Sequence, residues 1–235
     1  MLRTPENLTS QEKDRLSVRV LSAFSPHGPI DKVQLFAGRK DIVRKVLGAT
    51  FTRGRHVILF GERGVGKSSM VSVLHEFLTA DSNPGMKIFA PRINCDTTDN
   101  FDSVWRKIFA HIEITVEKDE KEIQVDLSEH LKDTPITPFV VQKELGNFEK
   151  NSLMVIIFDE FDSLKNDNAK KLFAETIKNL SDHSVPVTVI LVGVADTVDE
   201  LIKEHQSIDR NLLQACRTLR RAAAFPRILP KSRSR

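Results

Sequence analysis

Residues 61–68 read GERGVGKS, and this octapeptide constrains the fold more than any other part of the chain. It carries the pattern GxxxxGK[ST] with every fixed position filled. A short apolar run, 56–60, precedes it and predicts a buried strand, whereas residues 67–78 have the wide apolar stripe of a helix. A glycine-rich loop in this context turns its backbone N–H groups inward, and the positive end of the helix points to the same place. The sequence therefore predicts a phosphate-binding loop.

The loop residues have distinct expected roles toward a bound nucleotide. Lys67 is expected to reach the β- and γ-phosphates and to act in catalysis, and the Ser68 hydroxyl is expected to ligate Mg²⁺. A glycine-rich turn without a ligand is the simpler alternative, and it is disfavoured because the motif lies between the strand and the helix that it requires. The residues expected to bind the nucleotide here are Gly61, Glu62, Arg63, Gly64, Val65, Gly66, Lys67, Ser68 and Ser69.

A second segment, LMVIIFDE at 153–160, is the most hydrophobic predicted strand and ends in two carboxylates. Asp159 is placed to hold Mg²⁺ opposite the Ser68 hydroxyl, and Glu160 is placed to polarise the water that attacks the γ-phosphate. Acidic residues also end strands simply because they are solvated there. Taken alone, the strand fits both readings equally well, and the phosphate loop favours the catalytic one. Asp162 extends the acidic run, and no role is assigned to it.

A third apolar strand, 187–193, leads into VGVADT at 192–197. A polar side chain at its end would lie near the other two motifs, because parallel strands end at the same side of a sheet. Asp196 is therefore a candidate catalytic residue that orients water or contacts the γ-phosphate. The alternative is that Asp196 merely flanks the N-cap of the next helix.

Strands alternate with helices along the chain, which predicts an α/β protein with a parallel sheet and a ligand at the carboxyl ends of the strands. A further strand is expected at 86–95, weakened in the middle by Pro91. Thr137 and Pro138 predict a helix start as N-cap and first helical residue. Trp105, with Ile108 and Phe109 three and four residues on, is predicted to lie in the core. The other helices are expected at 9–24, 38–47, 67–78, 101–112 and about 169–180.

Three regions are expected along the sequence. Residues 1–34 hold a helix and a connector, and 35–214 form the nucleotide-binding core with an exposed charged insertion at about 115–136. The segment 215–235 is a basic tail that is expected to be disordered or atypical. The net charge of +3 arises there: the last 20 residues carry seven basic and no acidic side chains, which leaves −4 for the rest.

Composition excludes several classes of protein. The chain is 40% hydrophobic and 29% charged, as in a soluble globular domain. No apolar run approaches the roughly 18 residues of a membrane span, and the polar N-terminus resembles no secretory signal. Cys95 and Cys216 lack CxxC spacing, which argues against a disulfide framework or a zinc site. A cytoplasmic location and no membrane partner are expected.

Four segments together resemble the P-loop ATPases of the AAA+ class, in particular the origin-recognition-like and bacterial transposition-helper branch. They are LFAGRK (35–40), GERGVGKS (61–68), VIIFDEFD (155–162) and VGVADT (192–197). The resemblance covers about residues 25–213. It implies a three-layer P-loop NTPase fold, with a parallel sheet flanked by helices, and ATP with Mg²⁺ as cofactors. It also places Leu35 and Phe36 beside the adenine, and the absence of the guanine-reading NKxD motif agrees with ATP.

Members of this class receive an arginine from a neighbouring subunit, and Arg210 resembles that finger. The resemblance therefore implies a homo-oligomer or a partner protein; a solvated helix residue is the alternative for Arg210. A helical lid with a second sensor arginine normally follows the core. Only 25 residues follow Arg210, so most of the lid is expected to be missing and the C-terminus to be truncated or frame-altered, with weak turnover as a consequence.

Three functions remain open from the sequence. The leading one is an ATPase that hydrolyses ATP with Mg²⁺ to drive conformational change in an oligomer or partner. A nucleotide-dependent switch or scaffold with little turnover is the second. A DNA-associated initiator or transposition helper is the third, because nucleic acid binding is suggested only by the resemblance and the basic tail.

Overall fold

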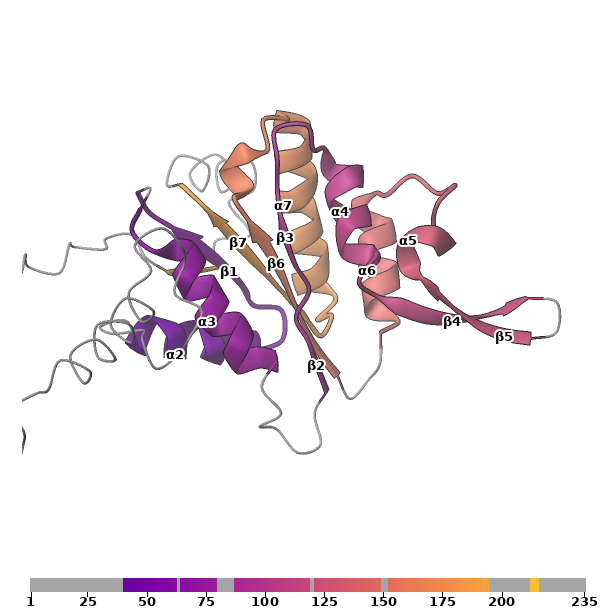
Figure 1. Cartoon of the computed structure of the whole chain (residues 1–235), viewed down its shortest axis with the longest axis horizontal. Helices are drawn as coiled ribbons and strands as arrows, with labels where there is room; N and C mark the ends of the chain where they lie inside the picture. Colours follow the sequence, from indigo (N-terminus) through magenta and orange to yellow (C-terminus); the bar gives the residue numbers. More distant parts are fainter. Residues whose placement is uncertain are drawn as a thin grey trace, which may run out of the picture.

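The structure is a computed structural model that describes residues 40–62, 64–79, 87–118, 121–148, 152–194 and 212–215. The described residues form three layers, with a central sheet between two groups of helices (Figure 1). The expected helix at 9–24, the segment 35–39 and the tail from Cys216 onward lie outside the described residues.

The central sheet is parallel throughout, with strand order β2-β6-β7-β1-β8 and β3 also paired with β6. Its central strands are buried on both faces, which explains why they read as continuous apolar runs in the sequence. The expected parallel α/β sheet is confirmed. The strands are β1 (His56–Phe60), β2 (Lys87–Phe89), β3 (Arg92–Asn94), β6 (Ser152–Asp159), β7 (Val187–Gly193) and β8 (Leu212–Ala215).

Alternate residues of β1 face different helical layers. Val57 and Leu59 pack with α2 (Lys40–Thr50) and α3 (Lys67–Thr79), whose buried side chains form one core cluster. Ile58 and Phe60 belong to the larger cluster on the other face. That face is covered by α4 (Phe101–Phe109), α6 (Pro138–Gly146) and α7 (Asp167–Asp182).

Side-chain caps begin the helices of the second layer. Asn100 and Ser103 form a reciprocal capping box at α4, and Asn166 caps α7. Thr137 accepts a hydrogen bond from the Val140 N–H, with Pro138 in the first turn, so the expected start of α6 is confirmed. The structure ends α4 at Phe109, earlier than the predicted residue 112, because the N–H groups of His111 and Ile112 bond three residues back rather than four.

The strand predicted over residues 86–95 is two short strands. Both pair with β6 in the same register, since Lys87 lies opposite Ser152 and Arg92 lies opposite Ile157. Pro91 has no N–H to donate, so regular pairing stops between β2 and β3. Its carbonyl still accepts from the Ile157 N–H at 2.9 Å.

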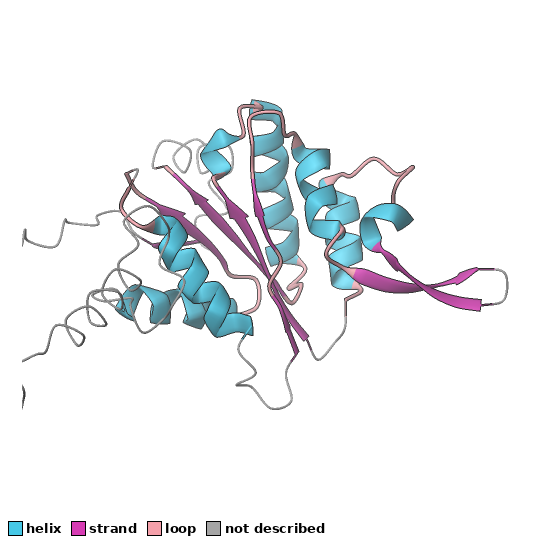
Figure 2. Cartoon of the chain, viewed as in Figure 1, coloured by secondary structure: helices cyan, strands magenta, loops and turns pink. Residues whose placement is uncertain are grey.

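The charged segment expected to be an exposed insertion is more ordered than its composition suggested. Strands β4 (Glu113–Lys118) and β5 (Lys121–Asp126) form an antiparallel hairpin that projects from the domain (Figure 2). The short helix α5 (Leu127–His130) follows, and it returns the chain to the core. Three of the segment's apolar side chains are buried there, and they are Leu127, Leu131 and Ile136. Because these residues are widely spaced among charged ones, they form no regular hydrophobic pattern that would predict their burial.

An aromatic cluster forms the centre of the larger core. Trp105 is fully buried, as predicted, and packs against Phe158 of β6 with ring centroids 5.2 Å apart. Phe173 of α7 contacts both of these rings and also Phe101. The cluster therefore joins α4 and α7 to the strand that ends in Asp159.

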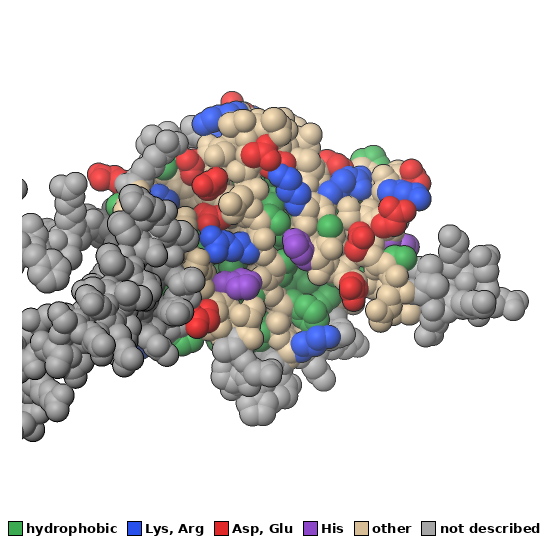
Figure 3. Space-filling view, viewed as in Figure 1, with side chains coloured by type: hydrophobic (Ala, Val, Ile, Leu, Met, Phe, Trp, Pro, Cys, Tyr) green, Lys and Arg blue, Asp and Glu red, His purple; other side chains and the backbone are tan. Residues whose placement is uncertain are grey.

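Charged side chains of both signs are interspersed on the face shown in Figure 3. None of the described helices has the length and apolar character needed to cross a membrane. Both observations agree with a domain whose apolar side chains are gathered in the two core clusters.

His56 at the start of β1 makes stability sensitive to acid. Its Nδ1 accepts from the Val189 N–H at 3.0 Å, and its buried Nε2 has no hydrogen-bond partner among the described residues. Burial lowers the pKa of His56 from 6.5 to about 4. Between these values the unfolded chain binds the proton and the folded chain does not, so stability present above pH 6.5 is lost as the pH falls toward 4.

We expect His56→Gln to remove this pH dependence. The loss of unfolding free energy between pH 7 and pH 5, measured in urea, should be smaller in the variant by about 2 kcal/mol. The exposed His111 provides a control, and His111→Gln should keep the parent's pH dependence. Equal losses in His56→Gln and the parent would contradict the assignment.

Candidate functional site

A cleft of about 440 Å³ opens at the carboxyl ends of the central strands. The loop after β1, the end of β6 and the end of β7 all contribute to it. Its lining residues are Gly64, Lys67, Ser68, Asp159, Glu160, Asp162, Ser163, Val192 and Val194. The three sequence motifs therefore meet in one cavity, at the side of a parallel sheet where ligands bind.

Two carbonyls at the start of the phosphate loop hold the Lys67 ammonium. Gly64 and Gly66 have φ angles of 77° and 84°, a left-handed conformation that favours glycine. The Lys67 Nζ donates to the Gly61 carbonyl at 2.8 Å and to the Glu62 carbonyl at 3.1 Å. These bonds hold a cation at the mouth of the loop, at the N-terminal end of α3. An anion placed there would meet the ammonium, the backbone N–H groups and the positive helix end together.

Two neighbouring carboxylates at the end of β6 differ in their exposure to solvent. Asp159 is only 3% exposed, and its Oδ1 accepts from the Glu160 N–H at 2.9 Å. Its Oδ2 accepts from Arg92 Nη2 at 2.6 Å. Glu160 is exposed and has a left-handed backbone, with φ 54° and ψ 36°. The buried carboxylate is thus fixed in place, whereas its neighbour reaches into the cleft.

Arg92 contacts a predicted site residue, and the sequence did not single it out. It lies on β3, within the strand predicted at 86–95, and its guanidinium bridges Asp159 and the Ser72 Oγ of α3. An arginine in an apolar strand beside a proline is the only signal the sequence offered. The register that brings it to Asp159 comes from the β3–β6 pairing.

Gly193 allows the end of β7 to approach the turn after Glu160. A Cβ at this glycine would lie 3.3 Å from Asp162 Oδ1 and 3.4 Å from the Asp162 backbone nitrogen. The 3₁₀ turn Phe161–Ser163 therefore packs tightly on β7. Asp162, which has no role in the sequence reading, lines the cleft as a result.

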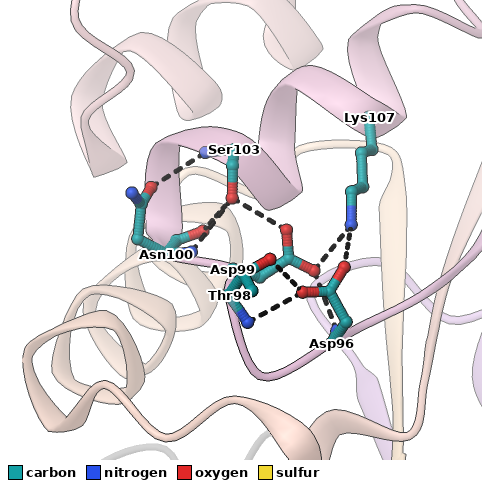
Figure 4. Close-up of polar contacts among 6 residues, drawn as sticks. All are labelled: Asp96, Thr98, Asp99, Asn100, Ser103 and Lys107. Atoms are coloured by element: carbon teal, nitrogen blue, oxygen red, sulfur yellow. Dashed lines mark hydrogen bonds and ion pairs between the residues drawn. The ribbon is translucent and has the colours of Figure 1, made fainter.

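The loop from β3 to α4 is held by a polar network (Figure 4). Lys107 of α4 donates to Asp96 at 2.9 Å and to Asp99 at 2.7 Å. Although partial burial opposes it, hydrogen bonding to Asp99 and Asp96 raises the pKa of Lys107. The Thr98 hydroxyl and then Lys107 lower the pKa of Asp96.

This network lies next to the end of β6, because the Cys95 N–H donates to the Asp159 carbonyl at 2.9 Å. Burial, followed by the Asp99 charge, raises the pKa of the Cys95 thiol to about 12. A thiol that stays protonated is a poor nucleophile. Cys95 is therefore a structural residue at the edge of the site.

The structure brings together part of the predicted site. Lys67, Ser68, Asp159 and Glu160 share the cleft with Gly64. The loop and the first turn of α3 hold Gly61, Glu62, Val65, Gly66 and Ser69. Five predicted residues lie outside the described residues and stay predictions, and they are Leu35, Phe36, Arg63, Asp196 and Arg210.

The oxygen ligands present fit Mg²⁺. The Ser68 hydroxyl of α3 and the Asp159 carboxylate of β6 line the same cleft. Among the described residues, no three His, Cys, Asp or Glu side chains gather into a complete metal site. Mg²⁺ is typically held by one or two protein oxygens with phosphates and water, so this sparse set suits a metal that arrives with a nucleotide.

A glycine-rich loop between a central parallel strand and a helix, beside a strand ending in carboxylates, defines a P-loop nucleotide-binding protein. The sequence profile of the AAA domain family matches residues 51–202. The chain belongs to this family.

Solved structures have a similar fold. The ORC1 protein of Aeropyrum pernix, in complex with DNA, has a TM-score of 0.53 and 15% identity, over 77% of this chain and 45% of that one. The Aeropyrum pernix ORC2 protein has a TM-score of 0.48 and 13% identity, over 83% of this chain and 51% of that one. Cdc6p of Pyrobaculum aerophilum has a TM-score of 0.47 and 15% identity, over 83% of this chain and 48% of that one.

The similarity to the ORC1 protein supports the fold alone, because the identity is 15%. The other two structures have TM-scores below 0.5, and no argument is based on them. This chain spans about half the length of these proteins. No curated protein matches the sequence.

Proposed function

We propose that the chain binds ATP with Mg²⁺ in this cleft and hydrolyses it to drive conformational change in an oligomer or partner. The observation that carries the proposal is the presence of Lys67, Ser68, Asp159 and Glu160 in one cavity. Membership of the AAA domain family supports nucleotide binding independently. The hydrolysis step and the metal rest on the chemistry of these four side chains.

Each side chain has a distinct part in the proposed reaction. Lys67 exchanges its bonds to the Gly61 and Glu62 carbonyls for contacts with the phosphates. Ser68 and Asp159 hold Mg²⁺, which neutralises charge on the transferring phosphoryl group when bound. Glu160 orients and polarises the attacking water, because its carboxylate is exposed to the cleft while Asp159 is buried.

Oligomer assembly and DNA association are proposed only from the family resemblance. Arg210 is proposed to act on the nucleotide of a neighbouring subunit, in which case turnover rises steeply with protein concentration. Binding of ATP with negligible turnover at every concentration would instead favour a nucleotide-dependent switch. DNA association ranks lowest, because the basic residues that favour it lie in the segment 216–235.

Glu160→Gln tests the base. We expect the variant to keep ATP affinity and to lose turnover by a factor on the order of 10²–10⁴, because the amide cannot accept the water's proton. Calorimetry measures binding, and phosphate release across a range of protein concentrations measures turnover. Glu175→Gln, at an exposed position of α7, is the matched control and should behave as the parent. Parental turnover in Glu160→Gln would show that another group activates the water.

A further inference from the structure

Arg92 links the two elements that carry the proposed metal ligands. Its Nη2 donates to Asp159 Oδ2 of β6 at 2.6 Å, and its Nη1 donates to Ser72 Oγ of α3 at 3.1 Å. The Ser72 hydroxyl in turn donates to the Ser68 carbonyl at 3.0 Å. One guanidinium thus connects the strand end that bears Asp159 to the helical turn that bears Ser68.

The positive charge of Arg92 is as important for Asp159 as the link that the side chain makes to α3. The Asp159 side chain is 4% exposed and that of Arg92 is 26% exposed, so the pair is largely shielded from solvent. A buried carboxylate requires a compensating cation, and Arg92 supplies it at short range. Any dication that used Asp159 would share this carboxylate with the guanidinium. Like charges at such range repel strongly, because solvent screens them poorly here.

We propose that Arg92 acts on the metal site through Asp159: its charge sets the Mg²⁺ concentration that nucleotide binding requires. The inference rests on the proposed function, because it assumes that Mg²⁺ enters beside Ser68 and Asp159. Before nucleotide binds, Arg92 neutralises the buried carboxylate. With Mg²⁺ bound, the guanidinium would still interact with Asp159, and the affinity of this carboxylate for the metal would be lower.

The test measures two quantities, which are the Mg²⁺ concentration that tight ATP binding requires and the affinity for ATP in the absence of Mg²⁺. We expect Arg92→Gln to lower the Mg²⁺ concentration for half-maximal tightening of ATP binding at least about tenfold, because a positive charge beside the metal is removed. Arg92→Lys keeps the charge and should stay within about threefold of the parent. Calorimetry at fixed ATP with increasing Mg²⁺ gives both values. ATP affinity in EDTA should change by less than about threefold in either variant.

Two further variants isolate the effect. Arg44→Gln removes an arginine from an exposed ion pair on α2 and should leave the Mg²⁺ requirement unchanged. Ser72→Ala keeps the charge of Arg92 but removes its contact with α3, together with the bond from Ser72 to the Ser68 carbonyl, and should change the Mg²⁺ requirement by less than about threefold. An unchanged or higher Mg²⁺ requirement in Arg92→Gln would overturn the proposal, and a parallel loss of affinity in EDTA would indicate a merely structural role.

The parent protein provides a second measurement in case Arg92→Gln does not fold. The guanidinium ¹⁵N signals of Arg92, assigned with Arg92→Lys, should show restricted rotation with ATP alone and faster rotation once Mg²⁺ is added. Unchanged signals would overturn the inference while leaving the proposed function standing. If Mg²⁺ has no effect on ATP binding by the parent, the proposed metal site itself is wrong.

Discussion

Lys67→Ala is expected to reduce ATP affinity by at least about a hundredfold. The side chain is the cation at the mouth of the phosphate loop, held by the carbonyls of Gly61 and Glu62. Its removal takes away charge-assisted hydrogen bonds to the phosphates, and two such bonds account for a change of this size. Calorimetry with ATP, in the presence and absence of Mg²⁺, measures the loss.

A matched substitution distinguishes this effect from a general loss of charge. Lys45 is exposed on α2, away from the cleft lining, and Lys45→Ala should bind ATP as the parent does. Thermal unfolding of both variants in the absence of nucleotide should give melting temperatures near that of the parent. Parental ATP affinity in Lys67→Ala would mean that the glycine-rich loop does not bind the phosphates.

Phe173→Ala is expected to lower the free energy of unfolding by about 4 kcal/mol. Phe173 is fully buried on α7, and its ring lies 5.1 Å from that of Phe158 and 4.9 Å from that of Phe161 between centroids. Truncation removes these contacts and leaves a cavity that the surrounding rings fill only in part. Urea denaturation monitored by the fluorescence of Trp105 gives the value.

The comparison for this variant is Phe139→Ala on α6. Phe139 is 65% exposed, so its truncation should change stability by less than about 0.5 kcal/mol. Because Phe161 follows Glu160 directly, Phe173→Ala should also disturb the turn that presents Glu160 to the cleft. A stability change below about 1 kcal/mol would show that the aromatic cluster repacks around the gap.

Local patterns predicted the part of the site that depends on short spacing. The strand before the phosphate loop, the loop itself and the helix after it have their signals within 23 residues, 56–78. Asp159 and Glu160 were found because a continuous apolar run precedes them. Thr137 marked a helix start because capping is a local interaction.

Features that depend on distant pairing were not predictable. Arg92 meets Asp159 across 67 positions, and only the register of β3 on β6 brings them together. The hairpin of β4 and β5 is formed by charged strands whose composition is typical of a solvated loop. Leu127 and Leu131 are buried because the chain turns back after that hairpin, which no periodicity in the segment reveals.

The backbone conformation of Glu160 lowers the stability of the domain. A left-handed φ of 54° is unfavourable for a residue with a side chain, by roughly 1–2 kcal/mol, and glycine would adopt it freely. The chain nevertheless carries a glutamate there, directly after a buried strand. If Glu160 activates water as proposed, the domain keeps a carboxylate at a position where glycine would relieve the backbone strain.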